Sequence, residues 1–473
     1  MRYYYAASLA AALAPLSDAL HLVRRDVPAV LHLETQRRTD IDFIAHDRLR
    51  RGLGKRDGKT LQADLDNLQT LYFANATLGT PEQSFRFHID TGSSDLWVNA
   101  ANSSFCEDSN NGCSDSGTYS PDDSSSYEFV NDDFNISYVD GSGATGDYAK
   151  ETFKFGGATV DGLQFGIGYT SSSPEGILGI GYTTNEVQVQ RVQGGQPYPN
   201  LPQALVDNGM INSNAYSLWL NDLDASMGSI LFGGVDTRKY NGELQTLPVI
   251  AESNGKYAEF IIALTGMGQN GQNGSIFSDQ TVPVLLDSGS TLMYLPDEVA
   301  DALFTSMNAQ YNSRAGVASI DCSAADSTDT LDFTFSGPTI SVPMNELVIV
   351  ASVSRRGVES CILGIAPSGG STAVLGDTFL RSAYVVYDLQ GNTISLAQTA
   401  FNSTESNVLE INSSGDIPNA TGVPGAIATA DVTGGGARNG GAGSTNSQGA
   451  GPRATAMPWA GAAAVGVGLL AVL

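Results

Sequence analysis

An internal repeat constrains the fold of this chain more than any other feature of its sequence. Two stretches, FHIDTGSSDLWV and VLLDSGSTLMYL, each place an acid, Asp90 or Asp287, directly after an apolar run. The glycine of an apolar-Leu-Gly triplet follows each acid, from 90 to 179 and from 287 to 376, which is 89 residues in both copies. A single DTG or DSG is unremarkable in a chain rich in Ser and Gly, whereas two copies with one downstream spacing indicate a duplication.

The duplication predicts two homologous lobes, residues 57–240 and residues 241–400. Each lobe would present one acid at the end of a buried strand, on a turn whose glycine permits close approach of the backbone. Short segments rich in Val, Ile, Thr, Tyr and Phe, separated by Gly, Asn and Asp, predict an all-β fold of two barrel-like lobes. If the lobes face each other, the two carboxyls meet in the cleft between them.

The charge distribution divides the chain and excludes some functions. The net charge is −26, but residues 20–56 carry nine Lys or Arg and five Asp or Glu, whereas the chain from Asp57 onward sums to −30 (14 basic minus 44 acidic). Such an acidic surface repels phosphate backbones, so nucleic acid is not an expected partner. His88 is the only histidine after Asp57, which excludes a multi-histidine zinc site and leaves a Ser-His-Asp mechanism resting on one residue. We expect no metal and no cofactor.

The N-terminus is typical of a secreted precursor. An apolar run is followed by Ser17 and Ala19, small residues at the −3 and −1 positions of a signal-peptidase site. This predicts a signal peptide over residues 1–19, with a buried helix as the alternative. Residues 20–56 would be a basic propeptide that covers an anionic cleft until its removal. Lys55-Arg56 stands where the composition changes from basic to acidic, so we expect a processing protease to cut there, although a Lys-Arg pair can also be plain surface charge.

The C-terminus predicts attachment to the cell surface. Residues 401–446 are mostly Ser, Thr, Gly, Ala and Asn, which is typical of a flexible stalk. Residues 447–473 end in an uncharged apolar tail, which predicts a GPI-attachment signal with the anchor near Asn446. A retained tail anchor is the alternative. The expected route runs through the secretory pathway to the plasma membrane, where a lipid holds the protein, with the cell wall as a further destination.

Sequons and cysteines fit a secreted protein as well. Seven Asn-x-Ser/Thr sequons predict N-linked glycans on the surface. They are Asn75, Asn102, Asn135, Asn273, Asn402, Asn412 and Asn419. Four cysteines, an even and sparse set, predict two disulfides, one local pair in each lobe. The pairs would be Cys106 with Cys113 and Cys322 with Cys361.

Over residues 68–400 the sequence resembles the pepsin family of aspartic proteases, and its motifs are specific in combination. Beyond the two acid motifs, ISYVDGSGATG resembles the family's flap, with Tyr138 at the flap tyrosine. LFGGVD resembles the strand that joins the lobes, and AVLGDTFLRSAYVVYDL resembles the closing motif of the second lobe. The phrase PAVLHLETQR, the short first cysteine loop and the anchor signal are similar to the fungal candidapepsin and yapsin branch. One departure is Val139, where the flap usually has glycine, and it bears on flap mobility and subsite shape.

The resemblance implies a bilobal pepsin-like fold and an aspartic endopeptidase that acts on polypeptides, and we expect a monomer. Two carboxyls about 3 Å apart do not both ionise readily, so Asp90 and Asp287 would share one proton at acid pH. The ionised partner would take a proton from water while the protonated one polarises the peptide carbonyl. The pair titrates as a unit, so neither acid is given a pKa of its own.

The resemblance also assigns roles to neighbouring residues. Six of them would support the acids: Thr91, Gly92, Ser93, Ser288, Gly289 and Ser290. In each copy the residue next to the acid would cross-link the two turns, the glycine would leave room for substrate backbone, and the following serine would bond the outer carboxylate oxygen. Four residues would contact substrate or shape the flap: Tyr138, Trp97, Asp140 and Thr291. The Tyr138 hydroxyl would lie near Trp97, and Asp140 would attract Lys or Arg in a substrate.

Plainer interpretations stand beside these. Tyr138 and Trp97 are common in ordinary cores, and Asp140 precedes a glycine, which is a turn signal. His88 is expected to be a strand residue with no catalytic role. An inert pepsin-like binding protein is the alternative function, but both acids and the flap tyrosine are present. A glycosidase, whose carboxylates stand about 5–9.5 Å apart, is disfavoured by the repeated turns, which indicate closer approach.

Overall fold

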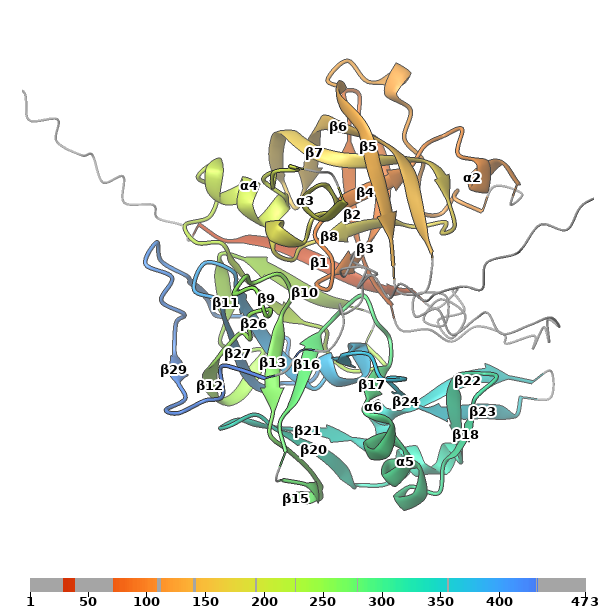
Figure 1. The fold of residues 1–473 in the computed structure, drawn as a ribbon, viewed down its shortest axis with the longest axis vertical. Helices are drawn as coiled ribbons and strands as arrows, with labels where there is room; N and C mark the ends of the chain where they lie inside the picture. Colours follow the sequence, from red (N-terminus) through yellow and green to blue (C-terminus); the bar gives the residue numbers. More distant parts are fainter. Residues whose placement is uncertain are drawn as a thin grey trace, which may run out of the picture.

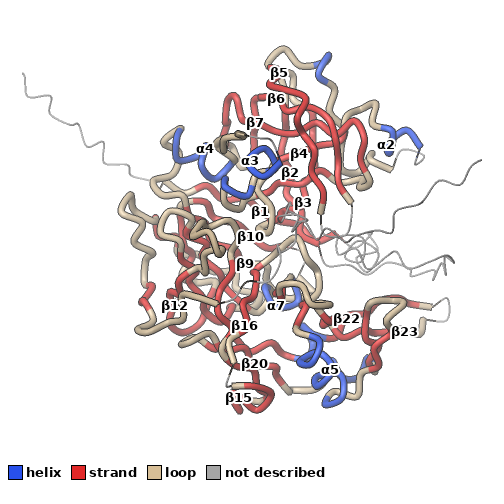
Figure 2. Tube along the Cα trace, viewed as in Figure 1, coloured by secondary structure: helices blue, strands red, loops and turns tan. Residues whose placement is uncertain are grey.

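The structure is a computed structural model that describes residues 29–38, 71–108, 112–138, 142–191, 194–225, 227–278, 280–354, 357–430 and 432. Several predicted features lie outside these residues: the signal peptide, the Lys55-Arg56 site, Val139, Asp140 and the anchor signal. Two β-rich lobes form the molecule (Figures 1 and 2), which confirms the predicted bilobal all-β fold. Among the described residues, no helix is both long and apolar enough to cross a membrane.

The first lobe is a sheet that closes on itself. Its strands follow the order β3-β8-β4-β7-β6-β5, and β2 closes the barrel by pairing with both β3 and β6. The strands are β2 (Leu71–Leu78), β3 (Gln83–Asp90), β4 (Leu96–Asn99), β5 (Glu128–Ser137), β6 (Gly143–Phe155), β7 (Ala158–Ser171) and β8 (Gly176–Gly179). Short helices connect them: α2 (Ser104–Asp108), η1 (Pro121–Asp123), η2 (Thr183–Asn185), α3 (Val187–Arg191) and α4 (Leu201–Asp207).

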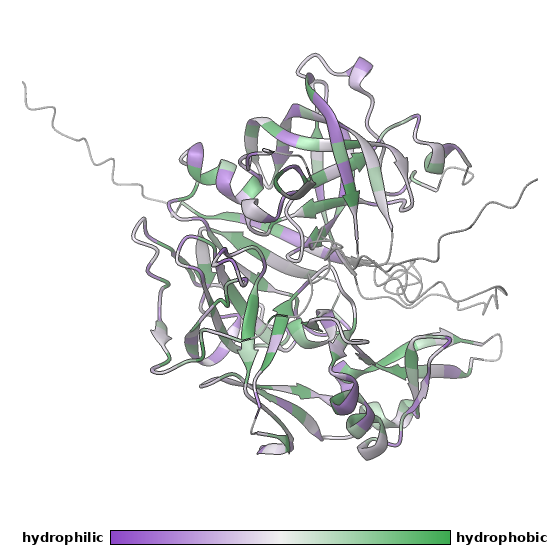
Figure 3. Ribbon diagram, in the orientation of Figure 1, coloured by the Kyte–Doolittle hydropathy of each residue, from purple (hydrophilic) through white to green (hydrophobic). Residues whose placement is uncertain are grey.

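The second lobe is built from three smaller sheets, with the orders β13-β16-β25-β17-β24, β15-β14-β20-β21 and β18-β19-β23-β22. The strands are β13 (Ile261–Leu264), β14 (Gly266–Gln269), β15 (Gln272–Phe277), β16 (Val282–Leu286), β17 (Met293–Leu295), β18 (Gln310–Asn312), β19 (Val317–Ile320), β20 (Thr330–Thr334), β21 (Thr339–Pro343), β22 (Val348–Val353), β23 (Glu359–Leu363), β24 (Ile365–Pro367) and β25 (Ala373–Leu375). Its helices are α5 (Asp297–Ser306), η3 (Cys322–Asp326), α6 (Met344–Leu347) and α7 (Asp377–Leu380). Figure 3 shows hydrophobic residues concentrated along its central strands β13 and β16, of which every residue except the half-buried Pro283 is buried.

Both lobes share a further set of strands. These are β9 (Ala215–Trp219), β10 (Met227–Phe232), β11 (Gly234–Asp236), β12 (Tyr240–Pro248), β26 (Ala383–Asp388) and β27 (Thr393–Thr399). The sheet order β12-β27-β26-β9-β10 continues through β1 and β2 into the barrel of the first lobe. A continuous backbone ladder therefore holds the lobes together.

The repeated spacing of 89 residues is the register of a strand pair. β3 pairs in parallel with β8, and β16 pairs in parallel with β25. The register joins Ile89 with Leu178 in the first lobe and Leu286 with Leu375 in the second. Both pairs are buried runs of the kind that parallel strands require. Each acid therefore lies at the carboxyl end of a strand that pairs with the strand formed by the apolar-Leu-Gly triplet of the same lobe.

One segment of the predicted propeptide belongs to the shared sheet. β1 (Leu31–Arg38) pairs antiparallel with β10, from Leu31 opposite Phe232 to Gln36 opposite Met227, and then with β2. Its Leu33 and Thr35 are buried, at 4% and 0% exposure. The described part of the predicted propeptide is therefore a strand of the shared sheet, whereas the sequence suggested a segment that covers the cleft. Its partner β10 lies far along the chain, with Leu31 opposite Phe232, and composition carries no sign of this pairing.

The predicted stalk also begins too early. Within residues 401–446, β28 (Val408–Glu410) pairs with β11, and β29 (Ala420–Gly422) pairs in parallel with β12. Ile411 is fully buried in a cluster with residues of β26 and β27. The boundary at 400 is wrong because a few well-placed apolar side chains are enough to fix a segment that runs along a sheet edge.

Both predicted disulfides are present. Cys106 in α2 joins Cys113, and Cys322 in η3 joins Cys361 in β23, with Cα–Cα distances of 5.4 and 5.2 Å. The described residues contain no free cysteine. Each link is local to one lobe, as expected from the duplication.

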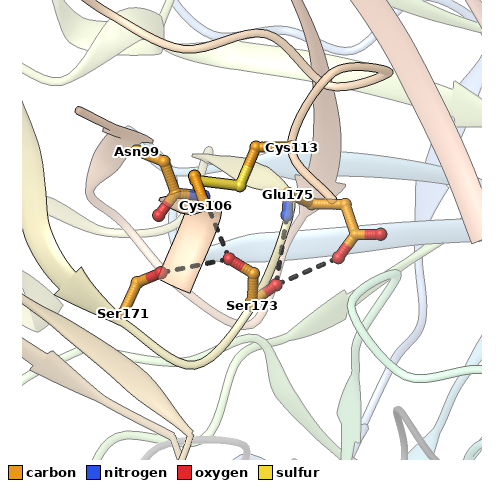
Figure 4. Close-up of a disulfide and its surroundings, with 6 residues drawn as sticks. All are labelled: Asn99, Cys106, Cys113, Ser171, Ser173 and Glu175. Atoms are coloured by element: carbon orange, nitrogen blue, oxygen red, sulfur yellow. Dashed lines mark hydrogen bonds between the residues drawn. A yellow bond between two sulfur atoms is a disulfide. The ribbon is translucent and has the colours of Figure 1, made fainter. Parts of the chain in front are cut away.

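Polar contacts surround the first disulfide (Figure 4). The carbonyl of Ser173 accepts hydrogen bonds from Asn99 Nδ2 (2.9 Å) and from Ser171 Oγ (3.2 Å). The Ser173 hydroxyl donates to Glu175 Oε2 (3.0 Å) and accepts from the Glu175 amide (3.3 Å). These bonds tie the segment between β7 and β8 to the end of β4, next to the disulfide.

Candidate active site

The two predicted acids lie on matching turns. Asp90 is the last residue of β3 and Asp287 follows β16 directly, and both are fully buried. Oδ1 of Asp90 accepts a hydrogen bond from the amide of Gly92 (2.9 Å), and Oδ1 of Asp287 accepts one from the amide of Gly289 (2.8 Å). The repeated sequence thus folds into a repeated geometry in which a turn amide fixes one oxygen of each carboxyl.

Thr91 and Ser288 bind the two turns to each other through two symmetric pairs of hydrogen bonds. Thr91 Oγ1 donates to the carbonyl of Leu286 (2.9 Å) and accepts from the amide of Ser288 (2.9 Å). Ser288 Oγ donates to the carbonyl of Ile89 (3.0 Å) and accepts from the amide of Thr91 (3.2 Å). All of these groups are buried, so the lobes are held in register directly beside the acids.

Gly92 shows how closely the two acids approach. Its amide bonds Asp90, and a Cβ placed on it would lie 2.5 Å from Oδ1 of Asp287 and 2.8 Å from its Cγ. Both carboxyls therefore contact the same residue, although they come from different lobes. Any larger side chain at this position would displace Asp287, so close approach requires glycine here.

The serine that follows each glycine behaves differently in the two lobes. Ser290 Oγ donates to Oδ2 of Asp287 at 2.7 Å. Ser93 is buried, but its hydroxyl makes no hydrogen bond to any described residue, so the predicted bond to Asp90 is not formed. Rotation about the Cα–Cβ bond places a serine Oγ in one of several rotamers, so the repeated turn fixes the backbone of Ser93 but not the position of its Oγ.

The flap tyrosine and the tryptophan of β4 lie in contact. Trp97 Nε1 donates to the hydroxyl of Tyr138 (2.8 Å), and both side chains are buried. They pack in a separate apolar cluster with Phe134 and Ile136 of β5 and Tyr148 of β6. Core packing and a flap role are therefore compatible for this pair, because the rings pack in an apolar cluster and a specific hydrogen bond fixes the Tyr138 hydroxyl.

Thr291 and His88 are buried as well. The carbonyl of Thr291 accepts hydrogen bonds from the amide (3.0 Å) and the hydroxyl (2.8 Å) of Thr378, which fixes the second turn against α7. His88 lies within β3 with its ring 5.5 Å from that of Phe73, in keeping with a strand residue. Asp140, the remaining candidate, is outside the described residues.

Comparison with known proteins decides the family. Residues 71–399 match the family Asp, eukaryotic aspartyl protease. This chain belongs to the eukaryotic aspartyl protease family. It is 55% identical over 432 residues to "Probable aspartic-type endopeptidase opsB" of Aspergillus oryzae, which covers 90% of this chain and 88% of that protein. It is 36% identical over 384 residues to "Aspartic proteinase yapsin-3" of Saccharomyces cerevisiae, which covers 79% and 74%.

A solved structure agrees on the fold. The crystal structure of aspartic proteinase from Irpex lacteus matches with a TM-score of 0.58 and 22% identity, and the match covers 71% of this chain and 96% of that one. The family predicted from the sequence is confirmed, and with it the enzyme class, an aspartic-type endopeptidase. The inert binding protein is not favoured.

Sequence reasoning missed two tyrosines near the acids of this aspartyl protease. The rings of Tyr216 and Tyr387 stack at 5.0 Å, and the Tyr216 hydroxyl donates to the carbonyl of Ile180 (3.0 Å). Burial raises the pKa of both hydroxyls far above the ordinary value. They therefore stay neutral and add no charge beside the carboxyls. Tyr387 stands in the closing motif AVLGDTFLRSAYVVYDL, which was the available signal.

A buried ion pair fixes the helix that follows the second triplet. Arg381 Nε lies 2.5 Å from Glu346 Oε2, and its Nη2 donates to the carbonyl of Glu346 (2.8 Å), with both side chains fully buried. Burial raises the pKa of the Glu346 carboxyl in spite of the facing guanidinium. Burial opposes charge on Arg381 too, but Glu346 together with the neighbouring Tyr72 and Asp377 outweighs it, so the pKa of Arg381 is raised. The ion pair holds α7 against α6. Thr378 of α7 in turn donates a hydrogen bond to the carbonyl of Thr291, which lies in the turn that follows Asp287.

Proposed function

We propose that this aspartic endopeptidase hydrolyses peptide bonds at acid pH with a water activated by Asp90 and Asp287. The observation that carries the proposal is the contact of both carboxyls with Gly92, beside hydrogen bonds that join the two turns. Like charges this close favour a state with one shared proton. The pair then holds a base and an acid at the same site.

The chemistry follows from that state. The ionised carboxyl takes a proton from water as the water oxygen attacks the peptide carbon, while the protonated carboxyl donates toward the carbonyl oxygen. Collapse of the tetrahedral intermediate breaks the C–N bond: the leaving nitrogen receives the proton that came from water, and a hydroxyl of the intermediate returns its proton to the other carboxylate as the new carboxyl group forms. The cycle returns the pair to one shared proton, with no covalent intermediate. The Gly92 and Gly289 amides and the Ser290 hydroxyl fix the carboxyl oxygens throughout.

The flap supplies closure and specificity in this proposal. Tyr138 closes over the substrate, with its hydroxyl held by Trp97. Thr291 belongs to the second turn, where it would line the site. Asp140, by the flap motif, would attract Lys or Arg in a substrate. A peptide library tests this role with the variant Asp140→Ala. An unchanged preference between basic and apolar residues would count against it.

We further propose that the enzyme is a glycosylated, surface-anchored monomer made as a precursor. All seven sequon asparagines have exposed side chains, which supports glycan attachment. The signal peptide, cleavage at Lys55-Arg56 and a GPI anchor near Asn446 rest on the sequence. Release from cells by a phosphatidylinositol-specific phospholipase tests the anchor, and N-terminal sequencing of the released enzyme tests the cleavage site.

The experiment on function is hydrolysis of a denatured protein at acid pH, with and without pepstatin, an inhibitor of aspartic proteases. The wild-type enzyme should release peptides, and pepstatin or Asp287→Asn should abolish their release. Activity that survives both changes would refute the paired-acid mechanism.

A further inference from the structure

Asp95 is a buried carboxylate near the acids, and the mechanism above does not use it. It follows Asp90 by five residues, and its side chain is 0% exposed. Oδ1 accepts hydrogen bonds from the hydroxyls of Tyr148 (2.7 Å) and Tyr198 (2.9 Å), and Oδ2 accepts one from the amide of Val187 (3.1 Å). A buried carboxyl group needs hydrogen-bond partners of this kind, and the three donors make Asp95 a structural junction.

The donors come from separate parts of the first lobe. Tyr148 lies on β6, which forms the flap hairpin with β5, and the hairpin continues to Tyr138, whose amide donates to the carbonyl of Ser142 (2.8 Å). Val187 begins α3, and Tyr198 precedes α4. Asp95 thus joins the turn after the catalytic acid to the base of the flap hairpin.

Aromatic contacts continue the same connection to the flap tyrosine. Ring centroids lie 5.7 Å apart for Tyr198 and Tyr148, 5.2 Å for Tyr148 and Phe134, and 6.3 Å for Phe134 and Trp97. Trp97 then bonds the hydroxyl of Tyr138. A shift of Tyr148 would therefore be transmitted by packed rings to the Trp97–Tyr138 pair.

The duplication shows that the turn itself does not need this acid. The residue five positions after Asp287 is Leu292, which is buried at 1% exposure. In both turns the glycine amide donates to Oδ1 of the acid, whether an acid or a leucine follows five positions on. The carboxylate stands only in the lobe that carries the Trp97–Tyr138 pair.

We propose that Asp95 is a positioning residue for catalysis, which holds the flap hairpin through Tyr148 and Tyr198 so that Tyr138 closes correctly over the substrate. This inference rests on the proposed function. Substitution of Asp95 should therefore lower kcat by displacing Tyr138, in addition to any loss of stability.

The test is a double-mutant cycle between Asp95 and Tyr138, with kcat and KM measured on a peptide substrate per active site titrated with pepstatin. Asp95→Leu should lower kcat about 10- to 100-fold in the wild-type background, with a smaller change in KM. In the Tyr138→Phe background the loss should be below about 3-fold, because the hydroxyl that Asp95 positions is already absent. Asp95→Asn keeps an acceptor oxygen and should recover most of the lost kcat.

Tyr119→Phe is the matched control. The Tyr119 hydroxyl donates to Glu151 Oε2 (2.7 Å), so this is another buried tyrosine–carboxylate pair, and its Glu151 lies on β6 further from the flap than Tyr148. This variant should lose stability and keep its kcat. If Asp95→Leu does not fold, Tyr148→Phe combined with Tyr198→Phe takes its place in the cycle under the same criteria.

Three results would overturn the inference: equal losses of kcat in both backgrounds, a wild-type kcat in Asp95→Leu or its replacement, or an equal loss in Tyr119→Phe. Each would reduce Asp95 to a residue that only stabilises the fold. Failure of the proposed function is distinguishable, because the wild-type enzyme would then show no pepstatin-sensitive hydrolysis.

Discussion

Replacing Thr91 with valine tests whether the hydrogen bonds between the lobes hold the two acids in register. Valine keeps the branched shape but removes the hydroxyl, which leaves the Leu286 carbonyl and the Ser288 amide without these partners in a buried place. An unsatisfied buried group costs about 1–3 kcal/mol, so the two together should lower the free energy of unfolding by about 2–6 kcal/mol. We also expect kcat to fall about 100-fold, because small misplacements of catalytic groups have effects of this order.

Urea unfolding at acid pH measures the stability, and hydrolysis of a quenched fluorescent peptide measures kcat per titrated site. Thr265→Val is the matched control: its Oγ1 donates to the Thr334 carbonyl (3.0 Å) and accepts from the Ser336 amide (2.8 Å), in a half-buried site in the second lobe. The control should lose less stability and no kcat. A Thr91→Val enzyme that unfolds and turns over like the wild type would refute the reasoning.

Three other perturbations have defined outcomes. Burial raises the pKa of Asp388 in the folded protein. Its contribution to the free energy of unfolding is therefore fully present below the ordinary carboxyl pKa and is lost as the pH rises through the raised pKa. Asp388→Asn should match the wild-type unfolding midpoint at about pH 3 and exceed it at about pH 6, and a difference independent of pH would contradict this. Replacing Cys322 and Cys361 by serine should cost about 4 kcal/mol in urea unfolding, because the disulfide spans 39 residues, and an unchanged midpoint would count against it. A chain that ends at 400 should melt lower than one that ends at 432, because it lacks β28 and β29; equal melting temperatures would show that these strands add nothing.

The repeat made the centre of the molecule predictable. Because 89 residues separate each acid from its glycine, and the structure shows this spacing as a parallel register, duplication alone placed Asp90 and Asp287 on equivalent turns. The local disulfides followed from the same division into lobes. The contact between Tyr138 and Trp97 needed the family resemblance, since neither residue has a partner nearby in the sequence.

Other features were beyond the sequence for a physical reason. Strand β1 pairs with β10, and strand β28 pairs with β11. Both partners are distant in the sequence, and neither strand has a hydrophobic pattern strong enough to identify it alone. The position of the Ser93 Oγ depends on one rotatable bond. Asp95 stood in the quoted motif DTGSSDLW, but its role depends on Tyr148 and Tyr198, which come from distant elements.

The central claim is that Asp90 and Asp287 act as one catalytic unit, and the most direct measurement is kcat for Asp90→Asn, Asp287→Asn and the double variant at acid pH. Groups that work as a unit give strongly non-additive losses. We predict that each single variant loses at least about 10⁴-fold in kcat and that the double variant loses no more than a single one. A single variant that keeps kcat within about 10-fold of wild type, or a double variant whose loss is the product of the two, would contradict the account.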